Sequence, residues 1–475
     1  MTWTRRRVLK TSGAAAAAPV LPGCTTGTSW SAPDCTLDEV VQSFFAEPYD
    51  AFVPLARWLG EGLGESELYA AAMNAAARWV WPGDDMHAAM VVRACQLLGA
   101  RLAEPERWVP LFWAWDQVHG AAGSDDLAPH DARGTSSTDD AQAGLEESWD
   151  RWDPAAADAY AAELYAVGGR PAVLEPLARY SLRNHDWLGH KAIWVAYALR
   201  SLDDFGWGCG EWVVRSLART IASQEESADT SAYEANLARL EEVPDGWRDG
   251  TDQPERVPEL LAALRSRDQM GCVDALLDCL HIGVSPRTCW TAMALHAVEQ
   301  GLRWGEGSYS VHHLDTLNAL RHLQDLSDDE DTARLSLLQG AAWSADFQAF
   351  QSGDPKLEEG LDTLAPAEGE TPTLDACLEA IGGSVSDVAR MLLAWQTAGG
   401  SALDLIDAWA PVAGLRQANA DQHRFKFHAA LLEEAEACLP EWQGRLLLGI
   451  PLRSPSATTP LWERHEEALE IIAGL

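Results

Sequence analysis

The feature that most constrains the fold is an apolar periodicity of three to four residues, which recurs along nearly the whole chain. Segments with this spacing are rich in alanine and leucine and end at glycine or proline, as amphipathic helices do. The clearest helices are expected over residues 86–102, 108–119, 155–167, 190–203, 211–224, 257–265, 272–281, 286–303, 313–326, 388–397, 402–410 and 423–438. Alternating β-branched runs are nearly absent. The sequence therefore predicts an all-α fold, as a large irregular multi-helix bundle or array without a regular repeat.

Three stretches rich in glycine, serine and aspartate predict mostly irregular loops over residues 120–148, 225–253 and 351–373. None of them divides the chain into regions of different character, because helices of the same kind resume after each. We expect one helical domain over residues 41–475, which could form two lobes, with a flexible linker over residues 25–40 before it.

The N-terminus has the plan of an export signal. A basic segment at residues 4–10 (TRRRVLK) is followed by an uncharged, alanine-rich stretch and then by LPGC, which ends at Cys24. The arginine pair resembles a twin-arginine signal, and LPGC resembles a lipobox. We expect the twin-arginine export machinery to carry the protein to the periplasm or cell envelope. Residues 1–23 would be the removed signal peptide, and a lipid on Cys24 would be the only membrane contact.

The charge and the cysteines exclude several function classes. The net charge of −37 repels phosphates, which argues against binding to nucleic acid or to an anionic membrane face. The cysteines are scattered and form no CxxC pair, which argues against zinc-ribbon and thioredoxin-like proteins.

Four segments share one local design, in which polar capping residues precede a histidine within about the first turn of an apolar helix. These histidines are His87, His190, His312 and His423. The positive end of the helix dipole disfavours imidazolium, and neutral imidazole is the form that binds metal. In an antiparallel bundle every second helix begins at the same end, so the four rings could converge on one cleft. The pattern predicts a transition-metal site for Cu, Fe or Zn, with His313 as an alternative to His312. In the competing interpretation, each histidine only caps its own helix.

Two lysines lie in the same segments. The chain beyond Cys24 has only three lysines, and Lys191 and Lys426 are two of them. A chain that otherwise uses arginine could need the compact ammonium group there. We expect both lysines to line the rim of the site and favour an anionic or carbonyl-bearing substrate, or to pair with Glu433 or Glu434.

A further candidate lies on another helix. Glu299 follows His296 by one helical turn, on a face that also carries apolar residues. A buried carboxylate at this position would be a candidate catalytic acid or base.

Three motifs carry a family resemblance. GHKAI at residues 189–193, WVPLFWA at 108–114 and VHHLDTLNALR at 311–321 are similar to motifs of uncharacterised twin-arginine-exported helical proteins. That group is distantly similar to the questin oxidase-like family. The resemblance implies an all-helical, oxygenase-type enzyme acting on an aromatic polyketide, and it favours His190 and His312 as functional residues.

Two classes of function follow from the sequence. One is an exported, metal-dependent oxidoreductase with a histidine-lined site for a small molecule. The other is a helical scaffold or ligand-binding lipoprotein without chemistry. Imidazoles that converge on one point favour the first class, and histidines scattered over the surface favour the second.

Overall fold

The computed structural model describes residues 37–43, 50–80, 86–121, 137–223, 229–305, 307–351, 354–416 and 422–475. These residues form 21 α-helices joined by turns and short 3-10 segments, and no strand occurs among them. One isolated bridge joins Thr251 to Val284. The predicted all-α class is therefore confirmed. No helix in the described ranges combines the length and apolarity that a membrane crossing requires.

Every helix expected from the periodicity is present, and most match the expected bounds within a few residues. The exception is α7 (Pro154–Ser181), which is kinked at Gly169 and continues well beyond the expected end at residue 167. The observed bounds are α4 (His87–Gly99), α5 (Val109–Ala121), α7 (Pro154–Ser181), α8 (His190–Phe205), α9 (Glu211–Ile221), α11 (Val257–Ser266), α12 (Gln269–His281), α13 (Pro286–Trp304), α14 (Ser308–Leu326), α17 (Val385–Thr397), α18 (Ala402–Leu415) and α19 (Gln422–Ala437). The other helices are α1 (Asp38–Ser43), α2 (Phe52–Gly60), α3 (Glu65–Trp79), α6 (Thr138–Asp150), α10 (Ser231–Leu237), α15 (Glu330–Ala349), α16 (Leu374–Glu379), α20 (Pro440–Leu446) and α21 (His465–Ala473).

Two of the predicted loops contain helices. Helix α6 lies largely inside the expected loop 120–148, and α10 lies inside 225–253. The polar start of α6 is a cap, because the Ser137 side chain accepts a hydrogen bond from the Asp140 backbone N–H at 3.1 Å. Beyond it, Ala141, Leu145 and Trp149 recur every four residues and are buried. The described part of 351–373 is irregular, as expected.

The N-terminal predictions lie mostly outside the described residues. The signal peptide at 1–23, Cys24 and the linker as far as residue 36 belong to this part of the chain. The end of the expected linker is helical, since α1 begins at Asp38 and buries Val40 in the core.

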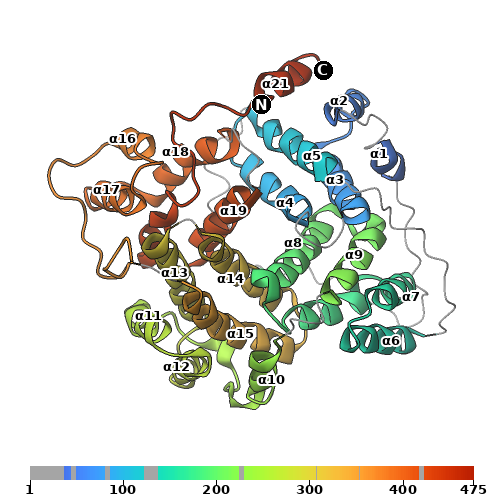
Figure 1. The fold of residues 1–475 in the computed structure, drawn as a ribbon, viewed down its shortest axis with the longest axis horizontal. Coiled ribbons are helices and arrows are strands. Elements are labelled where there is room, and N and C mark those ends of the chain that lie inside the picture. Colours follow the sequence, from blue (N-terminus) through green and yellow to red (C-terminus); the bar gives the residue numbers. More distant parts are fainter. Residues whose placement is uncertain are drawn as a thin grey trace.

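Four helices surround the middle of the molecule (Figure 1). They are α4, α8, α14 and α19, and each packs against the next, with α19 returning to α4. Helices α3, α5, α9, α13, α15 and α18 pack around this central bundle. Helix α8 is buried on all sides from His190 to Leu202, which is typical of a helix in the core of a large protein. Polar residues on these four helices therefore face the protein interior.

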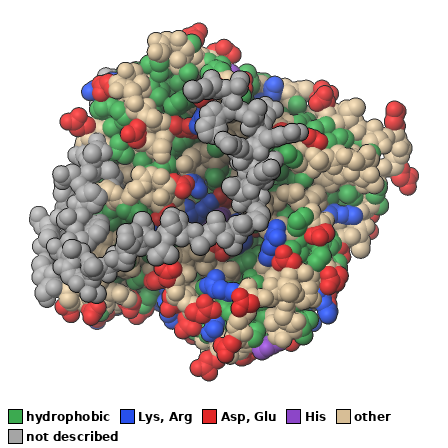
Figure 2. All heavy atoms as spheres, turned by 180° about the vertical axis from the view of Figure 1, so that it is seen from behind, with side chains coloured by type: hydrophobic (Ala, Val, Ile, Leu, Met, Phe, Trp, Pro, Cys, Tyr) green, Lys and Arg blue, Asp and Glu red, His purple; other side chains and the backbone are tan. Residues whose placement is uncertain are grey.

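The surface carries the excess of acidic residues. Figure 2 shows acidic and basic side chains interspersed on one face of the molecule. Many arginines are paired there with carboxylates, as Arg57 is with Glu61 at 2.9 Å.

Candidate metal centre

One histidine from each central helix reaches the same region of the interior. The Nε2 atom of His190 lies 2.8 Å from Nε2 of His87 and 3.0 Å from Nε2 of His312. One ring nitrogen from each of these three residues lies within 4.8 Å of the other two. The ring of His423 lies beside them, with its centroid 4.4 Å from that of His87 and 4.9 Å from that of His312. The structure thus brings together all four histidines that the sequence singled out.

Of the two neighbouring histidines on α14, His312 is the one that faces the cluster. His313 points to the other side of the helix, where its Nε2 lies 3.2 Å from the Ser344 hydroxyl. His190 and His312 are both buried, with exposed fractions of 7% and 1%. His87 and His423 are half-buried, so the cluster lies at the edge of the core.

The histidines converge for a different reason from the one expected. The four helices are adjacent and begin at the same end of the bundle, so they are not alternate members of an antiparallel array. The N-cap residues of α4, α8 and α14 are Met86, Gly189 and Gly307, and none makes a side-chain capping bond. The polar residues expected just before α4 and α19 lie outside the described residues.

A glycine sets the close approach of α8 to α14. Gly189 has φ +81°, and a Cβ atom at this position would lie 2.2 Å from Thr316 Oγ1. The Thr316 hydroxyl donates a hydrogen bond to the Leu188 carbonyl at 3.0 Å. Only glycine meets both conditions at low cost, and His190, the next residue, is thereby held against His312.

The nitrogen geometry is poorly explained by hydrogen bonds alone. An imidazole Nε2 offers either one hydrogen or one lone pair, yet Nε2 of His190 lies close to two other Nε2 atoms. A metal ion accepts three lone pairs at once. With metal–nitrogen bonds of about 2.0–2.1 Å, two ligands at a right angle place their nitrogens about 2.9 Å apart. The observed 2.8 and 3.0 Å match the right-angle spacing and are shorter than the roughly 3.3 Å of a tetrahedral zinc site.

Three of the histidines are close enough to hold a metal ion together, and the fourth lies beside them. The group whose nitrogens lie close enough to share an ion consists of His87, His190 and His312. His423 contributes a neighbouring ring. Three protein ligands with an open position are characteristic of catalytic rather than structural zinc sites. Imidazole donors also suit copper, iron and nickel.

Lys426 lies beneath the cluster rather than at its rim. Its side chain is fully buried, three residues after His423 on α19. It acts electrostatically on Asp315, which is equally buried and lies three residues after His312 on α14. The expected partners of Lys426 bond to other groups, Glu433 to Arg200 and Glu434 to Arg321.

Lys191 does not have the expected role at the rim. Its ammonium group donates hydrogen bonds to the carbonyls of Ile221 and Ser223, at 3.2 and 2.9 Å, and lies 4.6 Å from the centre of the Trp152 ring. Adjacent residues in a helix point about 100° apart, so Lys191 turns away from the direction of His190. It caps the C-terminal end of α9.

Glu299 is part of a buried ion pair, which argues against its expected role as an acid or base. Its side chain is fully buried and accepts hydrogen bonds from Arg265 at 2.8 and 2.5 Å. The Leu361 backbone N–H donates a third bond at 2.7 Å, and Arg303 lies 3.7 Å away. These partners occupy the lone pairs of the carboxylate, so Glu299 fastens α11 and a loop to α13.

A second group of histidines was not anticipated from the sequence. His296 and His313 have ring centroids 5.4 Å apart, and His185 lies nearby with its Nε2 3.6 Å from an Asp346 oxygen. Burial lowers the pKa of His296 to about 4 and that of His313 well below its ordinary value. The lowered pKa values favour the neutral form of His296 and His313, and the His313 ring stacks on Phe347 with the centroids 4.8 Å apart.

A second polar layer lies ten residues further along three of the central helices. Arg200 on α8 donates to Glu433 on α19 at 3.0 Å, and His322 on α14 lies 3.3 Å from the same carboxylate. Burial acts to raise the pKa of Glu433, but the hydrogen bond from His322 and the charge of Arg200 hold it below its ordinary value. Burial lowers the pKa of His322 to about 3. This layer joins α8, α14 and α19 at the end away from the cluster.

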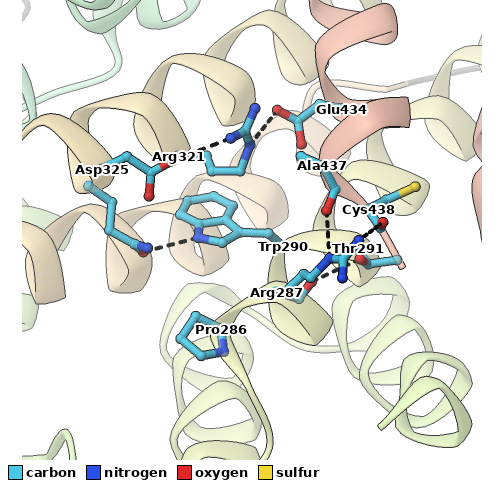
Figure 3. Close-up of a pocket in the computed structure, with 10 residues that line it drawn as sticks. Pro286, Arg287, Trp290, Thr291, Arg321, Asp325, Glu434, Ala437 and Cys438 are labelled. Atoms are coloured by element: carbon cyan, nitrogen blue, oxygen red, sulfur yellow. Dashed lines mark hydrogen bonds and ion pairs between the residues drawn. The ribbon is translucent and has the colours of Figure 1, made fainter. Parts of the chain in front are cut away.

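A cavity of about 180 Å³ lies next to the second layer (Figure 3). Its polar groups are already paired, since Arg321 donates to Glu434 at 2.8 Å and Trp290 donates to Gln324 at 3.0 Å. Arg287 donates to two backbone carbonyls at the end of α19. The cavity therefore offers space but little unsatisfied chemistry.

The chain matches no family model, no curated protein and no solved structure. The chemistry of the site therefore rests on its own geometry.

Proposed function

We propose that the protein binds a transition-metal ion through His87, His190 and His312 and uses it in oxidoreductase chemistry on a small molecule. The observation that carries the proposal is the position of His190 Nε2, 2.8 and 3.0 Å from the Nε2 atoms of its two neighbours. Three convergent imidazoles leave a coordination position open, as a catalytic ion requires. The motifs that resemble those of uncharacterised exported helical proteins, a group distantly similar to the questin oxidase-like family, are the reason to propose redox chemistry at such an ion. A scaffold without chemistry leaves the contact of His190 Nε2 with two other Nε2 atoms only partly explained, because one Nε2 atom makes one hydrogen bond.

The proposal places the protein in the cell envelope, exported through the twin-arginine signal and anchored by a lipid on Cys24. This route exports folded proteins, so the metal would be bound before export. An ion held inside the folded protein by three histidines is consistent with metal binding before export.

The test is metal analysis of protein exported by its own signal, followed by reconstitution of metal-free protein with copper, iron or zinc. We expect one ion per chain, lost when the triad is replaced. Fewer than about 0.1 ions per chain with every metal would refute the site. A native zinc ion has no redox chemistry of its own, so it would refute a redox-active metal while leaving the metal site intact.

A further inference from the structure

A charge pair lies in the core immediately inside the histidine cluster. Asp315 follows His312 on α14 by three residues, and Lys426 follows His423 on α19 by three residues. Three residues advance a helix by about 4.5 Å and stay on the same side of it. Because the rings of His312 and His423 are 4.9 Å apart, Asp315 and Lys426 continue the same interface one turn deeper.

Helix packing does not account for this pair. Both side chains have an exposed fraction of 0%. Neither oxygen of Asp315 accepts a hydrogen bond from any residue in the described ranges. Burying an ion without hydrogen bonds is costly, and apolar side chains of similar size usually stabilise such an interface as well or better.

Helix α8 contributes the third side of the region around Asp315 and Lys426. Tyr197 lies two turns beyond His190, and its hydroxyl is 3.5 Å from the Lys426 carbonyl oxygen. Burial raises the pKa of Tyr197 well above its ordinary value, and the charge of Asp315 raises it further. Burial likewise raises the pKa of Asp315, while the Lys426 ammonium acts in the opposite direction. Asp315 therefore lies where α8, α14 and α19 meet, on the inner side of the histidines.

We propose that Asp315 and Lys426 line the inner side of the histidine triad, where they would position a water molecule beside a bound metal ion. Asp315 accepts a hydrogen bond from this water, and Lys426 balances the charge of the carboxylate. Both are positioning residues, because they act on the bound ligand and not on the metal. The inference rests on the proposed metal site.

Azide is an anion that can replace this water, so its affinity depends on the charges of both Asp315 and Lys426. The experiment loads the full chain with cobalt(II) and follows azide binding by visible absorption. At about pH 8.5, above the Asp315 pKa of about 7, we expect Asp315→Asn to bind azide about tenfold more tightly, because a repelling charge close to the metal is lost. We expect Lys426→Met to bind azide about tenfold more weakly, because an attracting charge is lost. The double variant should return to within about threefold of the wild type, because the two charges cancel.

The control is Asp325→Asn, which removes a carboxylate ten residues further along α14 and should leave azide affinity within about twofold. Wild-type protein that takes up no cobalt overturns the metal site and this inference together. Normal cobalt uptake with unchanged azide affinity in the folded single variants overturns this inference alone. If only one of the two single variants folds, its azide affinity alone tests the inference. If neither single variant folds, the test uses the double variant, in which both charges are removed. A cobalt spectrum of this variant identical to that of the wild type would overturn the proposed water.

Discussion

Replacing His190 with alanine should weaken metal binding more than replacing any other histidine. Its Nε2 is the atom closest to both of the other triad nitrogens, at 2.8 and 3.0 Å. Metal binding to a four-ligand protein site is worth about 10–16 kcal/mol, so one ligand contributes about 3 kcal/mol. That corresponds to a rise in Kd of about 150-fold.

The same loss can be measured as stability. At a free metal concentration of 1,000 Kd, binding stabilises the folded state by about 4 kcal/mol. A Kd raised about 150-fold leaves about 1.2 kcal/mol at the same metal concentration. Chemical denaturation with and without metal gives this difference, and competition with a chromophoric chelator gives Kd directly.

The matched control is His428→Asn, which changes another buried histidine of α19. Its Nε2 lies 3.0 Å from the Ser454 hydroxyl, outside the triad. This variant should lose stability but keep the metal-dependent increment. A metal-dependent increment in His190→Ala that stays within about 0.5 kcal/mol of the wild-type value would show that the convergence has no role in metal binding.

Three further predictions address the parts that support the site. Gly189→Ala should raise Kd for the metal, measured by the same chelator competition, because a Cβ atom would lie 2.2 Å from Thr316 Oγ1 and move the start of α8. Unchanged affinity would show that this contact does not position the ligand. Glu299→Gln should lower the free energy of unfolding by about 1–3 kcal/mol, because the charge-assisted bonds from Arg265 are weakened while Arg265 keeps its pair with Asp362, and metal stoichiometry should stay normal. Loss of metal without loss of stability would restore Glu299 as a site residue. His296, whose folded pKa is lowered by burial to about 4, should contribute about 3 kcal/mol of stability that is fully present above pH 6.5 and lost as the pH falls toward 4. Denaturation of His296→Gln at pH 7 and pH 4.5 checks this, and a variant as acid-sensitive as the wild type would contradict it.

The helices were predictable because the apolar spacing determines them locally. The predicted loop over residues 120–148 is wrong because its polar composition obscures the helical spacing of its apolar residues. The segment around α6 reads as a loop from its serine and aspartate content, yet Ala141, Leu145 and Trp149 supply a buried face at helical spacing. Aspartates in the first turn of a helix are stabilised by the dipole, so they mark its start.

The histidines could be found from the sequence, but their neighbours could not be assigned. His190 and Lys191, or His312 and His313, differ by one position, and the direction of each side chain depends on how the helix is rotated in the bundle. That rotation depends on tertiary packing, which the local pattern does not reveal. The sequence therefore located the ends of the helices that meet, while it placed Lys191 on the wrong side and overlooked Asp315.

The second polar layer, formed by Arg200, His322 and Glu433, gives a physical reason for the close spacing of the histidines in the cluster. His190 and Arg200 are ten residues apart on α8, as are His312 and His322 on α14 and His423 and Glu433 on α19. Ten residues span about 15 Å, so one set of contacts at each end determines the axial register of the three helices.

A slip of one helical turn would move a histidine by about 5.4 Å, which exceeds the 2.8–3.0 Å separation of the triad nitrogens. The same slip would separate Arg200 from Glu433 and leave two buried charges without partners. Buried ion pairs add little net stability, but their rupture is strongly unfavourable. The second polar layer therefore acts mainly against axial misalignment of α8, α14 and α19. It keeps the nitrogens of the histidine cluster at their close spacing whether or not a metal is bound.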